Sequence, residues 1–195
     1  MPERSTFDLS TDEGSLRVLM LLWATTWPSS AWADGPHRGK VIDAETKEPI
    51  EGAVAVAVWM RRIFNPVEGQ EKFAEAKEAL TDKNGEFVIP GYTWTSIFID
   101  FIGVQPPRIY IFKAGYGDFP WRQVSPNPKQ SNAALLEPFK THAVVELPKT
   151  KTRKEQLDVY ADYSFFAAYP HEKMPNLIKM GNIERKNLGF EGVVR

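Results

Sequence analysis

The chain of 195 residues contains no cysteine and only three histidines. Without cysteine there is no disulfide and no cysteine to carry a lipid, so the fold has to depend on its hydrophobic core. Lysine and arginine, 24 together, nearly balance 25 aspartate and glutamate residues, so the basic excess expected of a nucleic-acid-binding protein is missing. Hydrophobic residues make up 43% of the chain, which is ordinary for a globular protein and predicts a folded body.

Long hydrophobic runs are also missing, apart from the ten residues of Val18–Trp27. As a helix they would span about 15 Å, half of a bilayer core, so we expect no stable membrane span. Arg17 precedes the run, and residues 31–33 (AWA) have the small-x-small form of a signal-peptidase site. The pattern predicts a signal peptide over residues 1–33 and a periplasmic or secreted mature protein.

The segment before Arg17 departs from that pattern, because it is acidic where a signal peptide is basic. Translation that begins closer to Arg17 would remove the discrepancy. The alternative is that Val18–Trp27 forms a buried N-terminal helix.

The clearest strand of the mature chain is Ala53–Trp59, which follows a polar turn closed by Pro49. With a period of two, Val54, Val56 and Val58 share one face, and Ala53, Ala55, Ala57 and Trp59 share the other. Both faces are apolar, so both are expected to be covered. We predict that the valine face meets the core and that helices near the C-terminus cover the alanine face.

Other strands are predicted at residues 40–43, 86–89, 108–112 and 141–147 from their alternation and β-branched content. Asn84-Gly85 predicts a tight hairpin, with both residues at positive φ and with Phe87 and Ile89 on the same side of its second strand.

Three further segments differ in how sharply the sequence defines them. Residues 70–80 are rich in Ala, Glu and Lys, which leaves a short helix and a returning strand both open. The proline-rich residues 117–139 are typical of a loop, with a short edge strand at 121–124. One helix is predicted to begin near Thr152, and another to lie between Pro175 and Gly189.

Four short motifs follow one another along the mature chain. They are G-x-V-x-D (Gly39, Val41, Asp43), P-I-x-G-A (Pro49 to Ala53), T-D-x-x-G-x-F-x-I (Thr81 to Ile89) and K-A-G-Y (Lys113 to Tyr116). In this order they resemble the carboxypeptidase regulatory-like domain, an accessory module of exported bacterial proteins. The resemblance implies a mainly β fold, a transthyretin-like (prealbumin-like) Greek-key β-sandwich of about seven strands. The expected domains are a signal peptide (1–33), the sandwich (34–148) and a helical C-terminal extension (149–195).

The chemistry of the chain predicts no enzyme, no cofactor and no metal site. His171-Glu172 lacks the His-x-x-Glu spacing of a zinc carboxypeptidase, and His37 and His142 are not expected to share an iron site. The segment from Asp82 to Glu86 lacks the distal ligands of a calcium loop. The resemblance therefore implies a non-catalytic module with a structural or protein-interaction role in the cell envelope.

A carbohydrate-binding module is the alternative, because sugars stack on exposed aromatic rings. Tyr92, Trp94 and Trp121 are the candidate ligand-binding residues, and the partner would be a glycan in place of an envelope protein. The competing interpretation is that the aromatic residues of segment 92–106 fill the end of the sandwich, since Ile97 and Ile99 are interleaved with them.

Overall fold

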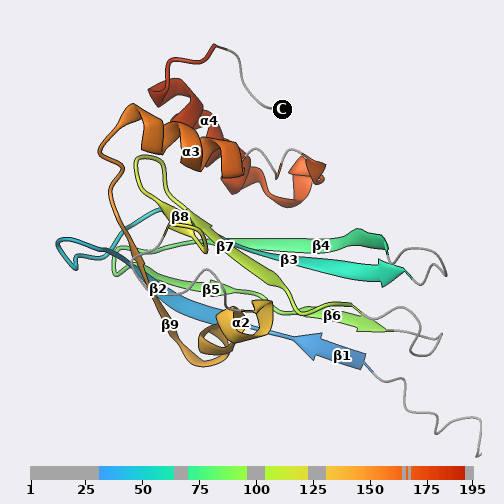
Figure 1. Ribbon diagram of the computed structural model, residues 1–195. Coiled ribbons are helices and arrows are strands. Elements are labelled where there is room, and N and C mark those ends of the chain that lie inside the picture. The colour runs from blue at the N-terminus through green and yellow to red at the C-terminus, as the bar shows by residue number, and fades with distance from the viewer. Residues whose placement is uncertain are drawn as a thin grey trace, which may run out of the picture.

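The computed structural model describes residues 31–63, 70–95, 104–122, 131–163, 166 and 168–191. Within these ranges the fold is mixed α/β, with two principal β-sheets, a two-stranded ladder and three α-helices (Figure 1). None of the described helices is long and apolar enough to span a membrane. Residues 1–30, most of the predicted signal peptide, lie outside the described residues.

The strands are β1 (Ala31–Asp34), β2 (His37–Asp43), β3 (Val54–Ile63), β4 (Gln70–Leu80), β5 (Glu86–Ile89), β6 (Tyr92–Thr95), β7 (Arg108–Phe112), β8 (Asp118–Phe119) and β9 (Ala143–Leu147). The helices are α2 (Asn132–Thr141), α3 (Arg153–Tyr163) and α4 (Pro175–Asn187), with a short 3-10 helix η2 (His171–Lys173) before α4. The predicted strands at 40–43, 53–59, 86–89, 108–112 and 141–147 are confirmed to within a few residues as β2, β3, β5, β7 and β9, and the two predicted C-terminal helices as α3 and α4. Residues 70–80, for which a helix and a strand were both open, form the strand β4.

The four-stranded sheet has the order β4-β3-β7-β8 and is antiparallel throughout. The three-stranded sheet has the order β5-β2-β9, in which β2 is antiparallel to β5 and parallel to β9. The β1–β6 ladder continues the β2–β5 ladder in the same register, since Asp34 pairs with Tyr92 and His37 pairs with Ile89. The predicted cleavage site after Ala33 falls within β1.

The inter-sheet core lies on the alanine face of β3. Ala53, Ala55, Ala57 and Trp59 are fully buried and pack with residues of β2, β5, β7, β9 and α2. The alanines leave room for large rings from elsewhere: Phe139 of α2 lies 5.3 Å from Phe119 and 6.3 Å from Phe87, centroid to centroid. The predicted assignment of the two faces is therefore wrong, because small residues on β3 accommodate bulky partners from the other layers.

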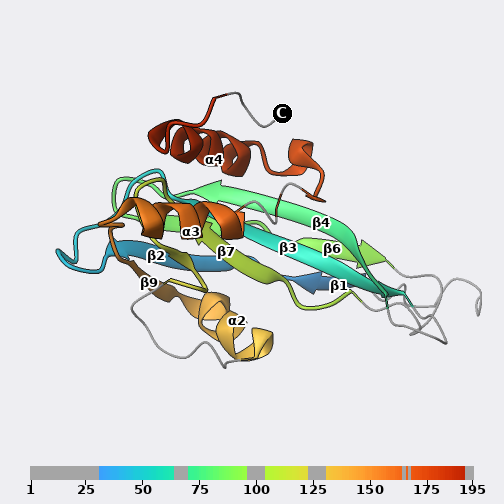
Figure 2. The ribbon, with the colours of Figure 1, turned by 45° about the horizontal axis from the view of Figure 1, so that its top comes forward.

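The helical layer covers the valine face of β3 (Figure 2). The apolar residues of this second cluster are Val54, Val56, Val58, Met60, Ala76, Tyr110, Phe112, Val159, Tyr163, Phe166, Met174, Leu177 and Ile178. Phe112 of β7 stacks on Tyr163 of α3 at 5.6 Å. Aromatic rings from β7 and from the helical layer supply the bulk here, so the valines form a continuous surface beneath them.

The turn at Asp82–Glu86 is tight, and Gly85 has a φ of +76°. The carboxylate of Asp82 accepts hydrogen bonds from the backbone N–H groups of Asn84 and Glu86, at 2.8 and 2.9 Å. However, the turn does not form a hairpin: β4 pairs with β3, and β5 pairs with β2. Asn84 also lacks the positive φ that was expected of it. The turn instead carries the chain from one sheet to the other.

The proline-rich segment differs from its predicted structure in two elements. The short edge strand lies at β8, before the expected residues 121–124, and α2 was not expected. Ser131 caps α2 by accepting a hydrogen bond from the backbone of Ala134, and Leu136 and Phe139 enter the inter-sheet core. Pro138 obscured this helix because a proline inside a helix removes a backbone donor.

Candidate functional site

The four family-like motifs meet at one end of the two sheets and bond to one another. The backbone N–H of Val41 donates to Gly85 O at 2.9 Å, and that of Ile50 donates to Val41 O at 3.0 Å. Thr81 Oγ1 accepts from the backbone of Ala53 at 2.8 Å and donates to Ile50 O at 2.6 Å. These bonds join residues of three motifs, so their polar groups are used to hold the loops together.

Asp43 connects the fourth motif to this end. Its carboxylate accepts from the backbone N–H groups of Glu45 and Thr46, lies 3.3 Å from the hydroxyl of Tyr116, and pairs with Lys149 at 3.1 Å. The hydrogen bond from Thr46 lowers the pKa of Asp43 to about 2, against the opposing effect of burial, and the bond from Glu45 and the Lys149 ammonium contribute. Asp43 is therefore an ionised structural anchor.

The structure does not bring the predicted ligand-binding residues together. Tyr92 is partly buried against the inter-sheet core and lies 5.5 Å from Trp59, centroid to centroid. Trp121 stacks on Tyr110, which belongs to the cluster on the other face of the four-stranded sheet. The backbone of Trp94 lies in β6, and its side chain is outside the described residues. Tyr92 and Trp121 thus lie against opposite faces of the four-stranded sheet.

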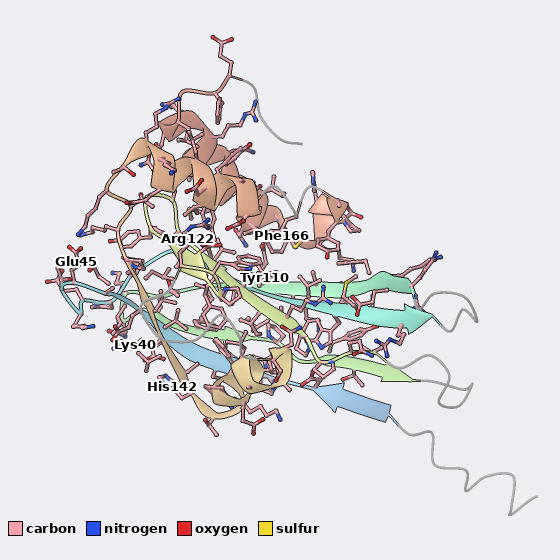
Figure 3. All side chains as sticks on the ribbon, in the orientation of Figure 1. Lys40, Glu45, Tyr110, Arg122, His142 and Phe166 are labelled. Atoms are coloured by element: carbon pink, nitrogen blue, oxygen red, sulfur yellow. The ribbon has the colours of Figure 1, made fainter. Side chains whose placement is uncertain are left out.

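Trp121 borders a small cleft between β7–β8 and the helical layer, which we call the Trp121 cleft. It is lined by Tyr110, Ile111, Phe112, Asp118, Phe119, Trp121, Val159, Tyr163, Phe166 and Leu177. Figure 3 shows Tyr110, Phe166 and Arg122 in this zone between the sheet and the helices. The cavity of about 10 Å³ has room for about one water molecule, so a larger ligand would lie on its rim.

A charged group stands beside the aromatic rings of the Trp121 cleft. Arg122 Nη1 lies 3.2 Å from Asp118 Oδ1 and also bonds to Asp162 of α3. The turn that positions Arg122 is closed by its own backbone N–H, which donates to Asp118 O at 2.7 Å. Arg122 therefore connects the end of β8 to the helical layer.

The pKa values of this group reflect burial and charge together. Burial raises the pKa of Asp118 to about 6, although Arg122 acts in the opposite direction. Burial lowers the pKa of Arg122, and the carboxylates of Asp162 and Asp118 more than offset this, so its pKa lies above the ordinary value. Asp118 therefore titrates at mildly acidic pH, while Arg122 stays charged.

His37, which was not expected to share an iron site with His142, lies in a second buried polar group. His37 is fully buried, and Nε2 lies 3.7 Å from Asp34 Oδ1. Neither ring nitrogen has a hydrogen-bond partner among the described residues. Asp34 instead accepts from Trp59 Nε1 at 3.3 Å. Burial lowers the pKa of His37, with Asp34 opposing and Lys140 reinforcing the shift.

Carboxylates also hold α4 against the sheet. Glu78 of β4 accepts from the backbone N–H groups of Asn176 and Leu177 at 2.7 and 3.0 Å, and from Asn176 Nδ2 at 2.6 Å. At the far end of α4, Glu184 Oε2 accepts from Gly115 N at 2.8 Å. Both contacts are structural, because they cap the helix start and fix the Lys113–Tyr116 turn.

The chain matches no protein-family model, no curated protein and no solved structure. Within the described ranges, no group of three or more His, Asp and Glu residues is placed to hold a metal ion. His142 is exposed and lies 2.7 Å from Glu86 Oε2, whereas His37 is buried. Two polar arrangements are left as candidate sites. One is the Trp121 cleft, and the other is the end of the two sheets where the four motifs bond to one another.

Proposed function

We propose that the chain is an exported, non-catalytic module with a transthyretin-like Greek-key β-sandwich and a structural or protein-interaction role in the cell envelope. The observation that carries this proposal is the mutual bonding of the four motifs, from Thr81 with Ile50 and Ala53 to Asp43 with Tyr116. Polar groups that bond to one another at the end of a sandwich stabilise its loops. The bonds between the motifs support the resemblance to the carboxypeptidase regulatory-like domain, whose family consists of accessory modules.

The outer face of the β5-β2-β9 sheet is the surface best suited to a protein partner. The four-stranded sheet has its outer face under α3 and α4, whereas Val88 and Val144 on this face are 51% and 54% exposed. Arg38 pairs in register with Val88, and Lys40 with Val144. Apolar side chains flanked by a polar rim are typical of protein interfaces.

Site-specific photo-crosslinking in the cells that make the protein tests this proposal. A photoreactive residue at Val88 or Val144 should give a discrete adduct with one envelope protein, and the same residue at Ile183 on α4 should not. N-terminal sequencing of the exported protein should begin at Asp34. Absence of adducts from both sheet positions, or a chain retained in the cytoplasm with its first residues intact, would contradict the proposal.

A further inference from the structure

The ring of Trp121 is half exposed and is supported from below. The ring is 49% exposed, although it stacks on the buried Tyr110 with centroids 5.3 Å apart and planes inclined by 30°. Tyr110 supports one face of the indole, so the exposed part is the other face and its edge. A rigid, supported aromatic face in water is a platform for a flat ligand with apolar C–H groups.

Hydrogen-bonding groups lie next to this platform and are fixed in place. Arg122, the next residue in the chain, is 32% exposed and is held by both Asp118 and Asp162. Asp162 is 35% exposed, so its carboxylate still reaches solvent. The guanidinium has five N–H donors, and a carboxylate has two acceptor oxygens, so each retains capacity for a ligand hydroxyl.

The charges select the kind of ligand. One guanidinium lies between two carboxylates, so Arg122 is already neutralised and an anionic group would meet Asp162. A phosphate or sulfate ester is therefore disfavoured. The cavity beneath, about 10 Å³, admits one hydroxyl at most, so a ring has to lie across the rim.

We propose that the Trp121 cleft binds one ring of a neutral saccharide, with its C–H face on Trp121 and its hydroxyls bonded to Arg122 and Asp162. This site goes beyond the proposed interaction role, because it lies on the helical side of the molecule and not on the outer face of β5-β2-β9. It uses Trp121 and no contribution from Tyr92, which lies on the other face of the sheet.

The test is a titration of the isotope-labelled full exported chain with cellohexaose, maltohexaose and chitohexaose, followed by the indole N–H signals of its three tryptophans, Trp59, Trp94 and Trp121. The signal that disappears in Trp121→Phe identifies Trp121. We expect at least one of these sugars to shift the Trp121 signal in a saturable manner. We also expect dextran sulfate to leave that signal unchanged.

Matched variants separate stacking from hydrogen bonding. Trp121→Ala should weaken binding at least about tenfold, as loss of a stacking platform does. Asp162→Asn should weaken binding severalfold, and Leu80→Ala, an exposed change at the end of β4 and outside the cleft, should leave it unchanged. The backbone spectrum of each variant verifies that the fold is intact.

Three outcomes would overturn the site: no Trp121 shift with any of the three sugars, unchanged affinity in Trp121→Ala, or stronger binding of dextran sulfate through the same residues. Each is independent of the crosslinking result at Val88 and Val144, so failure of one proposal does not imply failure of the other.

Discussion

The ring of Tyr163 lies directly against the α-carbon of Gly181, so close that a β-carbon at position 181 would stand 2.0 Å from Tyr163 Cζ. Gly181 is buried in α4, and Tyr163 is the last residue of α3. A glycine inside a helix ordinarily costs about 1 kcal/mol relative to alanine. Here the glycine allows α3 and α4 to approach each other closely, so the packing of the helical layer depends on the absence of a β-carbon at position 181.

Gly181→Ala should therefore lower the free energy of unfolding by about 1–3 kcal/mol, because overpacking outweighs the gain in helix propensity. Urea denaturation measures the change, with the exposed Lys179→Ala on the same helix as the control. In a Tyr163→Ala background the sign should reverse, since the ring is gone. Stabilisation by Gly181→Ala in the wild-type background would show that the contact is not tight.

Substitutions on the two faces of β3 should destabilise different layers of the fold. Val56→Ala removes two methyl groups under the helices and should cost about 2 kcal/mol. Ala57→Val overpacks the inter-sheet core and should cost about 1–3 kcal/mol. Hydrogen exchange should increase in α3 and α4 for the first variant, and in β2, β5 and β9 for the second. The opposite distribution would mean that the layers are assigned incorrectly.

Glu78 should contribute more to the docking of α4 than a surface ion pair does. Glu78→Gln replaces a carboxylate that accepts three N–H donors, and it should cost about 1–3 kcal/mol. Glu45→Gln, which breaks the exposed pair with Lys151, should have no measurable effect. Hydrogen exchange at the first turn of α4 provides the readout, and equal effects of the two variants would contradict the role of Glu78.

His37 should make the protein less stable in mild acid. Its folded-state pKa lies below the ordinary 6.5, so the unfolded chain binds the proton more readily. Stability is therefore complete above pH 6.5 and falls as the pH decreases toward the folded pKa. The facing charges are Asp34, which favours protonation, and Lys140, which opposes it. In His37→Leu this part of the pH dependence of the melting temperature should disappear; its persistence would assign it to another group.

Asp118 should act in the opposite sense. Its pKa of about 6 exceeds the ordinary 3.8, so the folded chain holds the proton more tightly. This contribution is present below pH 3.8 and is lost as the pH rises through 6. NMR titration of the Asp118 carboxyl should give a midpoint near 6, and Asp118→Asn should remove the corresponding slope. A midpoint near 3.8 would show that Arg122 compensates fully for the burial.

Local signals in the sequence predicted much of the fold. Pro175 and Gly189 bracket α4, and Gly85 has the positive φ that its turn requires. The alternation in β3 correctly separated the valines from the alanines. Each of these features depends on residues close together in the chain, so the sequence contains the information directly.

Of the candidate site, the sequence identified Trp121 and missed its surroundings. Tyr110, Arg122 and Asp162 meet only when β7, the turn after β8 and α3 are assembled. His37 shares the buried face of β2 with Val41, yet nothing in the sequence distinguishes a buried histidine there from an exposed one.

By itself the sequence determined the strands β2, β3, β5, β7 and β9, the turn at Gly85 and the two C-terminal helices, because backbone preferences and hydrophobic period act over a few residues. Only the tertiary structure decided which face of β3 meets the second sheet, that β4 and β5 join different sheets, and that Pro138 lies within a helix. Those outcomes depend on the volumes and hydrogen-bond partners supplied by distant segments, which compete for each surface. An alternation with a period of two shows which residues of a strand share a face. Only the packing of the other layers decides what that face contacts.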